Sequence, residues 1–182
     1  MSSYGTVHLI TSFMAIVAGG WVVLIQKGTR WHRTLGHVYA MSMLGVLASA
    51  FGICDLTGSF GPFHFAAIVG SVTLAGGLWT VLMRRPKKNW ITAHAIWMSW
   101  SYIGLIAAFF AESLTRFVMP RLAPVLASNA QAWGAFWTSV AVASFAVFGV
   151  GWWLVKTRLP AAVAATPAAM RQERRALEVE VG

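Results

Sequence analysis

Five histidines are the residues best suited to chemistry in this sequence of 182 residues. An imidazole titrates near neutral pH and is the commonest protein ligand for transition metals. The five are His8, His32, His37, His64 and His94. All lie near the ends of long apolar stretches and none lies in the middle of one. Because an ionisable side chain within a membrane is costly, such a residue indicates a functional site.

The spacing of four of these histidines is nearly regular. The intervals from His8 through His37 and His64 to His94 are 29, 27 and 30 residues. One histidine therefore recurs for each apolar stretch and its turn. In a bundle whose helices run alternately up and down, His8 and His64 would meet near one end. His94 would meet His37 or His32 near the other end.

Composition sets the class of protein that holds these histidines. Hydrophobic residues make up 58% of the chain and charged residues 10%, whereas soluble domains carry about 25% charged residues. Five apolar stretches each have about 20 residues, the length that a helix needs to cross a bilayer. They are residues 6–25, 35–54, 63–83, 90–111 and 133–155. The sequence predicts an all-α polytopic membrane bundle over residues 1–158, with five transmembrane helices that form a four-helix core plus one.

The basic residues predict the orientation of the chain. Most of the 14 Lys and Arg follow the first, third or fifth stretch, and only Arg116 and Arg121 lie on the opposite side. The positive-inside rule then places the N-terminus outside and the C-terminus in the cytoplasm. We expect a multi-pass protein of a bacterial inner membrane, in contact with membrane lipid. The net charge of +9 thus reflects topology and gives no sign of nucleic-acid binding. Residues 159–182 are predicted to form a partly disordered cytoplasmic tail.

Side chains that share a helical face with the histidines are candidates to surround a cofactor. Ser101 and Tyr102 follow His94 by about two turns, and stripes of small and polar residues normally face neighbouring helices. We expect Ser101 and Tyr102 to orient a ligand or to line a proton path. We expect Gly36 to leave room for a flat cofactor, and Arg33 to meet the acidic groups of that cofactor.

Two facing imidazoles can occupy both axial positions of a haem iron. The sequence therefore predicts a transmembrane b-type cytochrome with two haem b groups and a bis-histidine site near each membrane face. The outer ligands would be His8 and His64, and the inner ligands His94 with His37 or His32. His32 and His37 are five residues apart, so they point about 140° apart on a helix, and the greater depth of His37 slightly favours it. A quinone or a periplasmic redox protein is the expected partner.

Two other functions fit the same histidines. The protein can bind or transport haem or a transition metal such as zinc or copper, with entry and exit sites at the two faces. It can also be a non-catalytic accessory subunit, in a homo-oligomer or a larger membrane complex, whose histidines only make structural hydrogen bonds. The chain is an oxidoreductase-type electron-transfer protein only if haem is bound, so its status as an enzyme stays open. Glu112 and Arg116 have the spacing of an exposed helix ion pair.

Several short motifs carry a resemblance to a family. They are Gly5-Thr6-Val7-His8, then Lys27-Gly28-Thr29-Arg30-Trp31-His32-Arg33, then His94 with Trp97, Met98, Ser101 and Tyr102. From Gly5 to Arg116 the chain resembles a group of bacterial predicted membrane proteins that share a domain of unknown function. The resemblance implies a four-helix core to which the fifth helix and the tail are additions, and it implies that His32 rather than His37 is the family position. It implies no activity.

A looser, architectural resemblance is to the di-haem cytochromes b that are reduced by ascorbate or that oxidise superoxide. In those proteins, histidines on alternating helices hold one haem near each face. This likeness involves His8, His64, His94 and one of His32 or His37.

Overall fold

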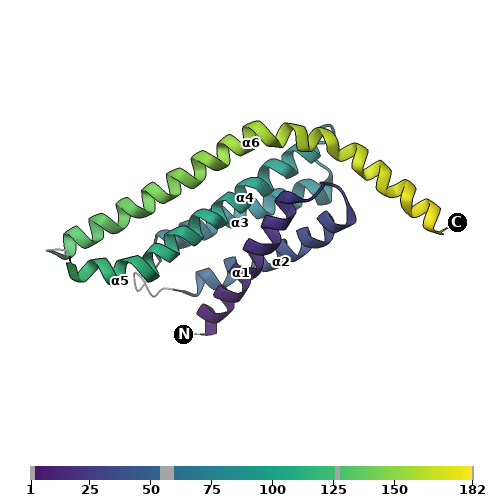
Figure 1. The fold of residues 1–182 in the computed structure, drawn as a ribbon. Helices are drawn as coiled ribbons and strands as arrows, with labels where there is room; N and C mark the ends of the chain where they lie inside the picture. Colours follow the sequence, from purple (N-terminus) through teal and green to yellow (C-terminus); the bar gives the residue numbers. More distant parts are fainter. Residues whose placement is uncertain (1–2, 54–59, 126–127, 182) are drawn as a thin grey trace.

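The computed structural model describes residues 3–53, 60–125 and 128–181, and nearly all of them are helical (Figure 1). Four long helices follow one another in alternating directions. They are α1 (Ser3–Leu24), α2 (Arg30–Phe51), α3 (Pro62–Met83) and α4 (Trp90–Ser113). A π-helical turn η1 (Leu114–Val118), a short helix α5 (Met119–Leu122) and a 3-10 turn η2 (Ala123–Val125) then lead to the long helix α6 (Asn129–Val181).

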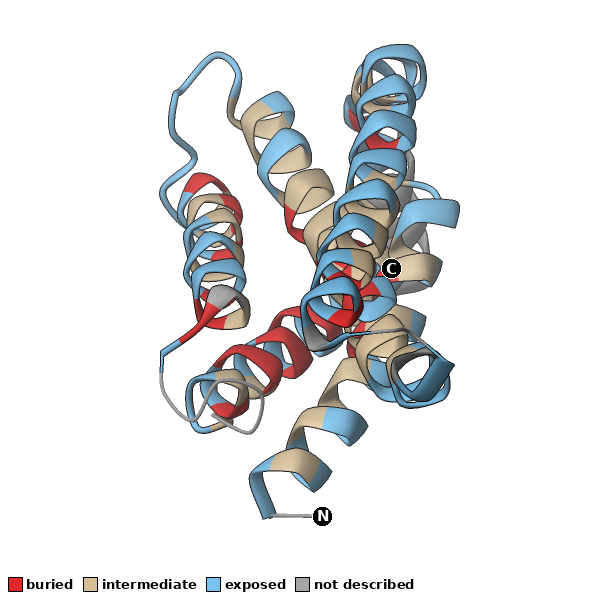
Figure 2. Ribbon diagram, turned by 90° about the vertical axis from the view of Figure 1, so that its left-hand side faces the viewer, coloured by how far each residue is buried: buried red, intermediate tan, exposed pale blue. Residues whose placement is uncertain are grey.

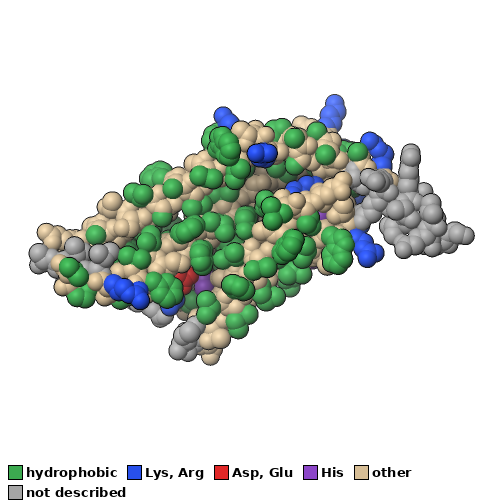
Figure 3. Space-filling view, in the orientation of Figure 1, with side chains coloured by type: hydrophobic (Ala, Val, Ile, Leu, Met, Phe, Trp, Pro, Cys, Tyr) green, Lys and Arg blue, Asp and Glu red, His purple; other side chains and the backbone are tan. Residues whose placement is uncertain are grey.

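Within the described residues, five helices are long and apolar enough to cross a membrane. This confirms the predicted all-α class and the predicted number of spans. Hydrophobic side chains cover most of the face that Figure 3 draws, as contact with a bilayer requires. The protein is therefore a membrane protein that contacts lipid along its helices.

The second span begins five residues earlier than the apolar stretch predicted at 35–54. The side chain of Thr29 is the N-cap of α2, and its Oγ1 accepts a hydrogen bond of 3.3 Å from the backbone N–H of His32. Such a cap satisfies a backbone donor that the first helical turn leaves unpaired. As a result, α2 starts at Arg30 and His32 lies in its first turn rather than in the preceding loop.

The first four helices form a ring, and α6 lies along the outside of α4. In the ring, α1 packs along α2, α2 lies beside α3, α3 packs along α4, and α4 returns to meet α1 (Figure 1). Buried residues gather where the helix faces point toward one another (Figure 2). Helices α2 and α4 therefore face each other across the ring and run in the same direction.

Glycine residues allow the helices of the ring to approach closely. A Cβ atom on Gly19 of α1 would lie 2.5 Å from two ring carbons of Tyr102 on α4 and 3.0 Å from the ring of Tyr39 on α2. A Cβ atom on Gly45 of α2 would lie 2.7 Å from Thr11 of α1. Small residues at contacts of this kind are the usual means of packing helices within a membrane.

Helix α6 continues to Val181, through the segment predicted to be a partly disordered tail. Alanine has the highest helix propensity, and this segment is rich in alanine. Pro160 and Pro167 lie inside the helix, and the yellow end of α6 bends away from the ring (Figure 1). Thr166 is nevertheless buried, because it lies against Gly28 in the turn between α1 and α2.

We predict that Gly19→Ala lowers the thermal midpoint of the purified protein in detergent. The new methyl group would overlap the ring of Tyr102, and overpacking of this kind costs about 1–3 kcal/mol. The control is Gly104→Ala, because a Cβ atom at Gly104 would meet no heavy atom within 4 Å. Equal midpoints for the two variants would contradict the packing of α1 against α4.

Candidate functional site

The two ends of the ring each carry histidines. We call the end with the turns at residues 25–29 and 84–89 the inner end, and the opposite end the outer end, following the predicted orientation. His32 on α2 and His94 on α4 lie at the inner end, whereas His8 on α1 and His64 on α3 lie at the outer end.

His32 and His94 face each other across the ring. Halfway along the bundle, Tyr39 Oη of α2 and Ser101 Oγ of α4 share a hydrogen bond of 2.9 Å. Because the two helices run in the same direction, positions seven residues before this contact also lie opposite each other, about two turns nearer the inner end. Those positions are His32 and His94. An electrostatic interaction links the two imidazoles.

The ring nitrogens of this pair differ in their contacts. Nδ1 of His94 lies 2.9 Å from the carbonyl oxygen of Gly77 on α3. Since a carbonyl only accepts, Nδ1 is the donor, and in a neutral imidazole Nε2 then carries the lone pair. Nδ1 of His32 is buried and has no hydrogen-bond partner among the described residues. Leaving a buried nitrogen without a hydrogen bond costs about 1–3 kcal/mol in folding free energy. A group that bonds to Nδ1 of His32 would remove this cost.

His37 points away from this pair. Its side chain is exposed, and Nδ1 hydrogen-bonds to the carbonyl oxygen of Arg33 in its own helix, at 2.7 Å. The structure therefore brings His32, and not His37, toward His94. The depth argument that favoured His37 assumed that the span starts near residue 35, whereas the helix starts at Arg30.

Open space and positive charge surround His32. A Cβ atom on Gly36, one turn further along α2, would meet no heavy atom within 4 Å. The guanidinium of Arg33 is exposed and donates a hydrogen bond of 3.2 Å to the carbonyl of Gly28. The ammonium of Lys27 donates to backbone carbonyls at the end of α1, and burial lowers the pKa of Lys27. Both cations lie within electrostatic range of His32.

Ser101 and Tyr102 lie in the centre of the ring. Ser101 is 1% exposed and bonds to Tyr39, which is 2% exposed. The hydroxyl of Tyr102 donates a hydrogen bond of 3.2 Å to the carbonyl of Ile16 on α1, and the two tyrosine rings meet edge to face. Ser101 thus joins α4 to α2, and Tyr102 joins α4 to α1, both nearer the middle of the bundle than His32 and His94. Tyr39 was not predicted as a site residue, although its spacing of seven from His32 was a signal.

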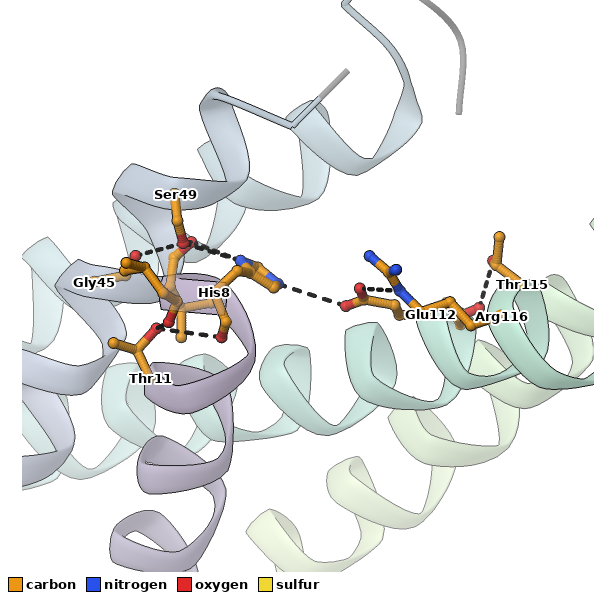
Figure 4. A network of polar contacts seen from close by, with 10 residues as sticks. His8, Thr11, Gly45, Ser49, Glu112, Thr115 and Arg116 are labelled. Atoms are coloured by element: carbon orange, nitrogen blue, oxygen red, sulfur yellow. Dashed lines mark hydrogen bonds and ion pairs between the residues drawn. The ribbon is translucent and has the colours of Figure 1, made fainter. Parts of the chain in front are cut away.

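At the outer end, His8 belongs to a network of three helices (Figure 4). Nδ1 of His8 lies 3.2 Å from the carbonyl oxygen of Val46 and 3.1 Å from Oγ of Ser49, both on α2. Nε2 points toward Glu112 on α4, 3.5 Å from Oε2. The other carboxylate oxygen of Glu112 accepts a hydrogen bond of 2.8 Å from Nε of Arg116. This confirms the predicted Glu112–Arg116 pair, whereas the contact of Glu112 with His8 has no signal in the sequence.

His64 has different surroundings from His8. It is 4% exposed, and its Nδ1 accepts a hydrogen bond of 3.0 Å from the backbone N–H of Gly61, so the neutral ring carries its proton on Nε2. The ring of Phe60 stacks on it with centroids 4.8 Å apart. These contacts with Gly61 and Phe60 hold His64 at the start of its own helix.

We predict an energetic coupling between Tyr39 and Ser101. Tyr39→Phe and Ser101→Ala each remove the hydrogen bond between α2 and α4, so their effects on the free energy of unfolding should be less than additive, by about 0.6–1.7 kcal/mol. Unfolding in mixed micelles gives the required four free energies. The pair Tyr39→Phe and Ser139→Ala is the control and should be additive, because the hydroxyl of Ser139 bonds to Ala135 within α6. Additivity in both pairs would contradict the predicted register of α2 and α4.

Comparison with known proteins gives one match. A family model described as "Predicted membrane protein (DUF2306)" matches residues 5–147. The match covers the four helices of the ring and the first part of α6, and so it includes both inner histidines. No curated protein and no solved structure matches the chain.

Proposed function

The chain belongs to the DUF2306 family of predicted membrane proteins, and on the residues of its inner end we propose that it is a b-type haem protein that transfers electrons in the membrane. The haem b would be held by His32 and His94. The setting is a bacterial inner membrane, with the haem near the cytoplasmic face. The family description contains no activity, so the proposal rests on the site.

Two points carry this proposal: the register of α2 and α4 puts positions 32 and 94 opposite each other, and Nδ1 of His32 is buried without a hydrogen-bond partner among the described residues. Buried polar atoms are almost always satisfied by protein or water, so an orphaned nitrogen calls for a ligand. Coordination to iron would remove the cost of leaving it unpaired. The residues at the inner end therefore fit a haem.

The number of ligands favours haem over a bare metal ion at this place. Zinc and copper sites in proteins generally use three or four side chains. The His, Cys, Asp and Glu side chains of the described residues come together in pairs and not in groups of three. Two imidazoles suffice for a haem, because the porphyrin itself supplies four of the six positions around the iron.

Each residue of the inner end has a distinct part in this proposal. The carbonyl of Gly77 fixes the ring of His94, as outer hydrogen bonds commonly do for metal-binding histidines. The space beside Gly36 accommodates part of a flat ring. Arg33 and Lys27 supply positive charge for the propionate groups. When bound, the haem supplies a one-electron couple between ferrous and ferric iron.

We limit the proposal to one haem. Nδ1 of His64 accepts a hydrogen bond, so Nε2 of its neutral ring carries the proton, and Nε2 of His8 faces Glu112. A second haem at the outer end would require these contacts to break. A quinone is then the more suitable redox partner, since it diffuses within the bilayer, whereas a periplasmic protein would need a site at the outer end.

We expect the protein, produced with sufficient haem and purified without a polyhistidine tag, to have a Soret band and sharp bands on reduction. His32→Ala and His94→Ala should each abolish the sharp bands of the reduced protein, because the iron would then lack one of its two axial imidazoles. His37→Ala is the matched control and should leave the spectrum unchanged, since His37 is exposed on the same helix.

A colourless wild-type protein, or a His32→Ala variant that retains the full spectrum, would overturn this proposal. Size-exclusion chromatography of each variant separates loss of haem from loss of fold. A colourless protein that copurifies with other membrane proteins would instead favour the accessory-subunit function.

A further inference from the structure

We propose that Lys156 and Arg158 on α6 bind the phosphate headgroup of an anionic phospholipid, in the bilayer leaflet at the inner end. Both side chains are exposed, on the helix that lies along the outside of α4 (Figure 1). The site is separate from the inner histidine pair, and it does not depend on haem binding. Three features carry this proposal: the depth of the two cations, the charges of the inner end, and the aromatic rings beside Lys156.

The packing of α6 on α4 fixes the depth of the two cations. The helices run in opposite directions, because α4 leads to the outer end and α6 returns from it. A Cβ atom on Gly151 would lie 2.6 Å from Cδ1 of Ile103, so these two positions are opposite each other. Lys156 and Arg158 are then opposite positions of α4 that lie about 12 and 9 Å beyond its first residue, Trp90, at 1.5 Å per residue.

This depth puts the two cations within the apolar part of the bundle. The candidate membrane spans of α4 and α6 are Trp90–Arg121 and Ala130–Ala168, so both include the level at which Lys156 and Arg158 lie. A charged side chain beside lipid tails is costly, and such side chains generally pair with an opposite charge or extend to the interface. A lipid phosphate drawn to α6 would supply the opposite charge.

The described side chains of the inner end supply no carboxylate for this role. Among the acidic residues, only Glu112 has a described side chain, and it lies at the outer end beside His8. The α3–α4 turn instead adds four exposed cations to the inner end: Arg84, Arg85, Lys87 and Lys88. Clusters of Lys and Arg next to membrane spans attract anionic lipids. The charge of this end is therefore complementary to a phosphate headgroup.

Aromatic rings hold Lys156 at the lipid-facing surface. Its ammonium lies over the ring of Trp152, 4.7 Å from the centroid. That ring is itself held by Trp100 of α4, with centroids 6.1 Å apart. A cation–π contact orients an ammonium without neutralising its charge, so the charge remains available to a phosphate. Trp152 and Trp153 are 50% and 57% exposed, and their rings offer a surface for the acyl chains of the same lipid.

The test compares the purified protein in nanodiscs of phosphatidylcholine with the protein in nanodiscs that also contain phosphatidylglycerol. We expect phosphatidylglycerol to raise the thermal midpoint of the wild type, because a ligand that binds only the folded protein stabilises it. The double variant Lys156→Gln and Arg158→Gln should lose most of this rise. The matched control is Lys87→Gln with Lys88→Gln, which removes the same charge from the exposed α3–α4 turn and should keep most of the rise.

Native mass spectrometry gives a second readout, since it counts the lipids on the folded protein directly. From micelles with equal parts of the two lipids, the wild type and the turn variant should retain phosphatidylglycerol in preference to phosphatidylcholine. The α6 double variant should lose this preference.

Equal losses in the two double variants would overturn the proposal, because they would reflect net charge rather than a site on α6. Absence of a preference in the wild type would overturn it as well. Inorganic phosphate should leave the thermal midpoint unchanged, and a rise equal to that with phosphatidylglycerol would contradict a lipid as the ligand. Haem has no part in these readouts, so the two proposals can fail separately.

Discussion

The hydrogen bond between Tyr39 and Ser101 fixes the register on which the polar interior of this bundle depends. Both side chains are buried at the middle of the ring, where no water is available to replace a lost partner. Once α2 and α4 are held at this register, their first turns lie at the same depth. This register places positions 32 and 94 opposite each other, and no direct contact between the two histidines is needed for that placement. The inner site is thus a consequence of a contact two turns away.

Four of the five histidines have different neighbours, and these neighbours determine the contacts that each imidazole makes. His64 caps the start of α3 and His37 lies on the surface. His8 links three helices through a carbonyl, a hydroxyl and a carboxylate. His32 is the exception, because its Nδ1 is buried and has no hydrogen-bond partner among the described residues. Since an unpaired buried group is costly, this exception is the strongest indication of a ligand.

The sequence predicted the spans well because span length and apolar composition are local properties. It predicted the inner pair less well, because the choice between His32 and His37 depended on where α2 begins. The apolar stretch suggested residue 35, but the cap at Thr29 starts the helix at Arg30, so His32 lies in its first turn. The family resemblance favoured His32, in agreement with this geometry.

The contact of His8 with Glu112 could not be predicted, because it joins the first and fourth helices of the ring and has no local sequence signal. The helical course of residues 159–181 was also missed. There the charged residues suggested disorder, whereas the alanines favour a helix. The two misses have different causes: the first depends on which distant segments meet, which composition and spacing do not record, and the second on the weight given to local helix propensity.

The most direct test of the inner site is the electron paramagnetic resonance spectrum of the oxidised, haem-loaded protein at low temperature. Ligation by His32 and His94 predicts a low-spin ferric signal of the kind that two axial imidazoles produce. A high-spin signal, from iron with one histidine or none, would contradict the account, since it would mean that the two rings do not share an iron atom.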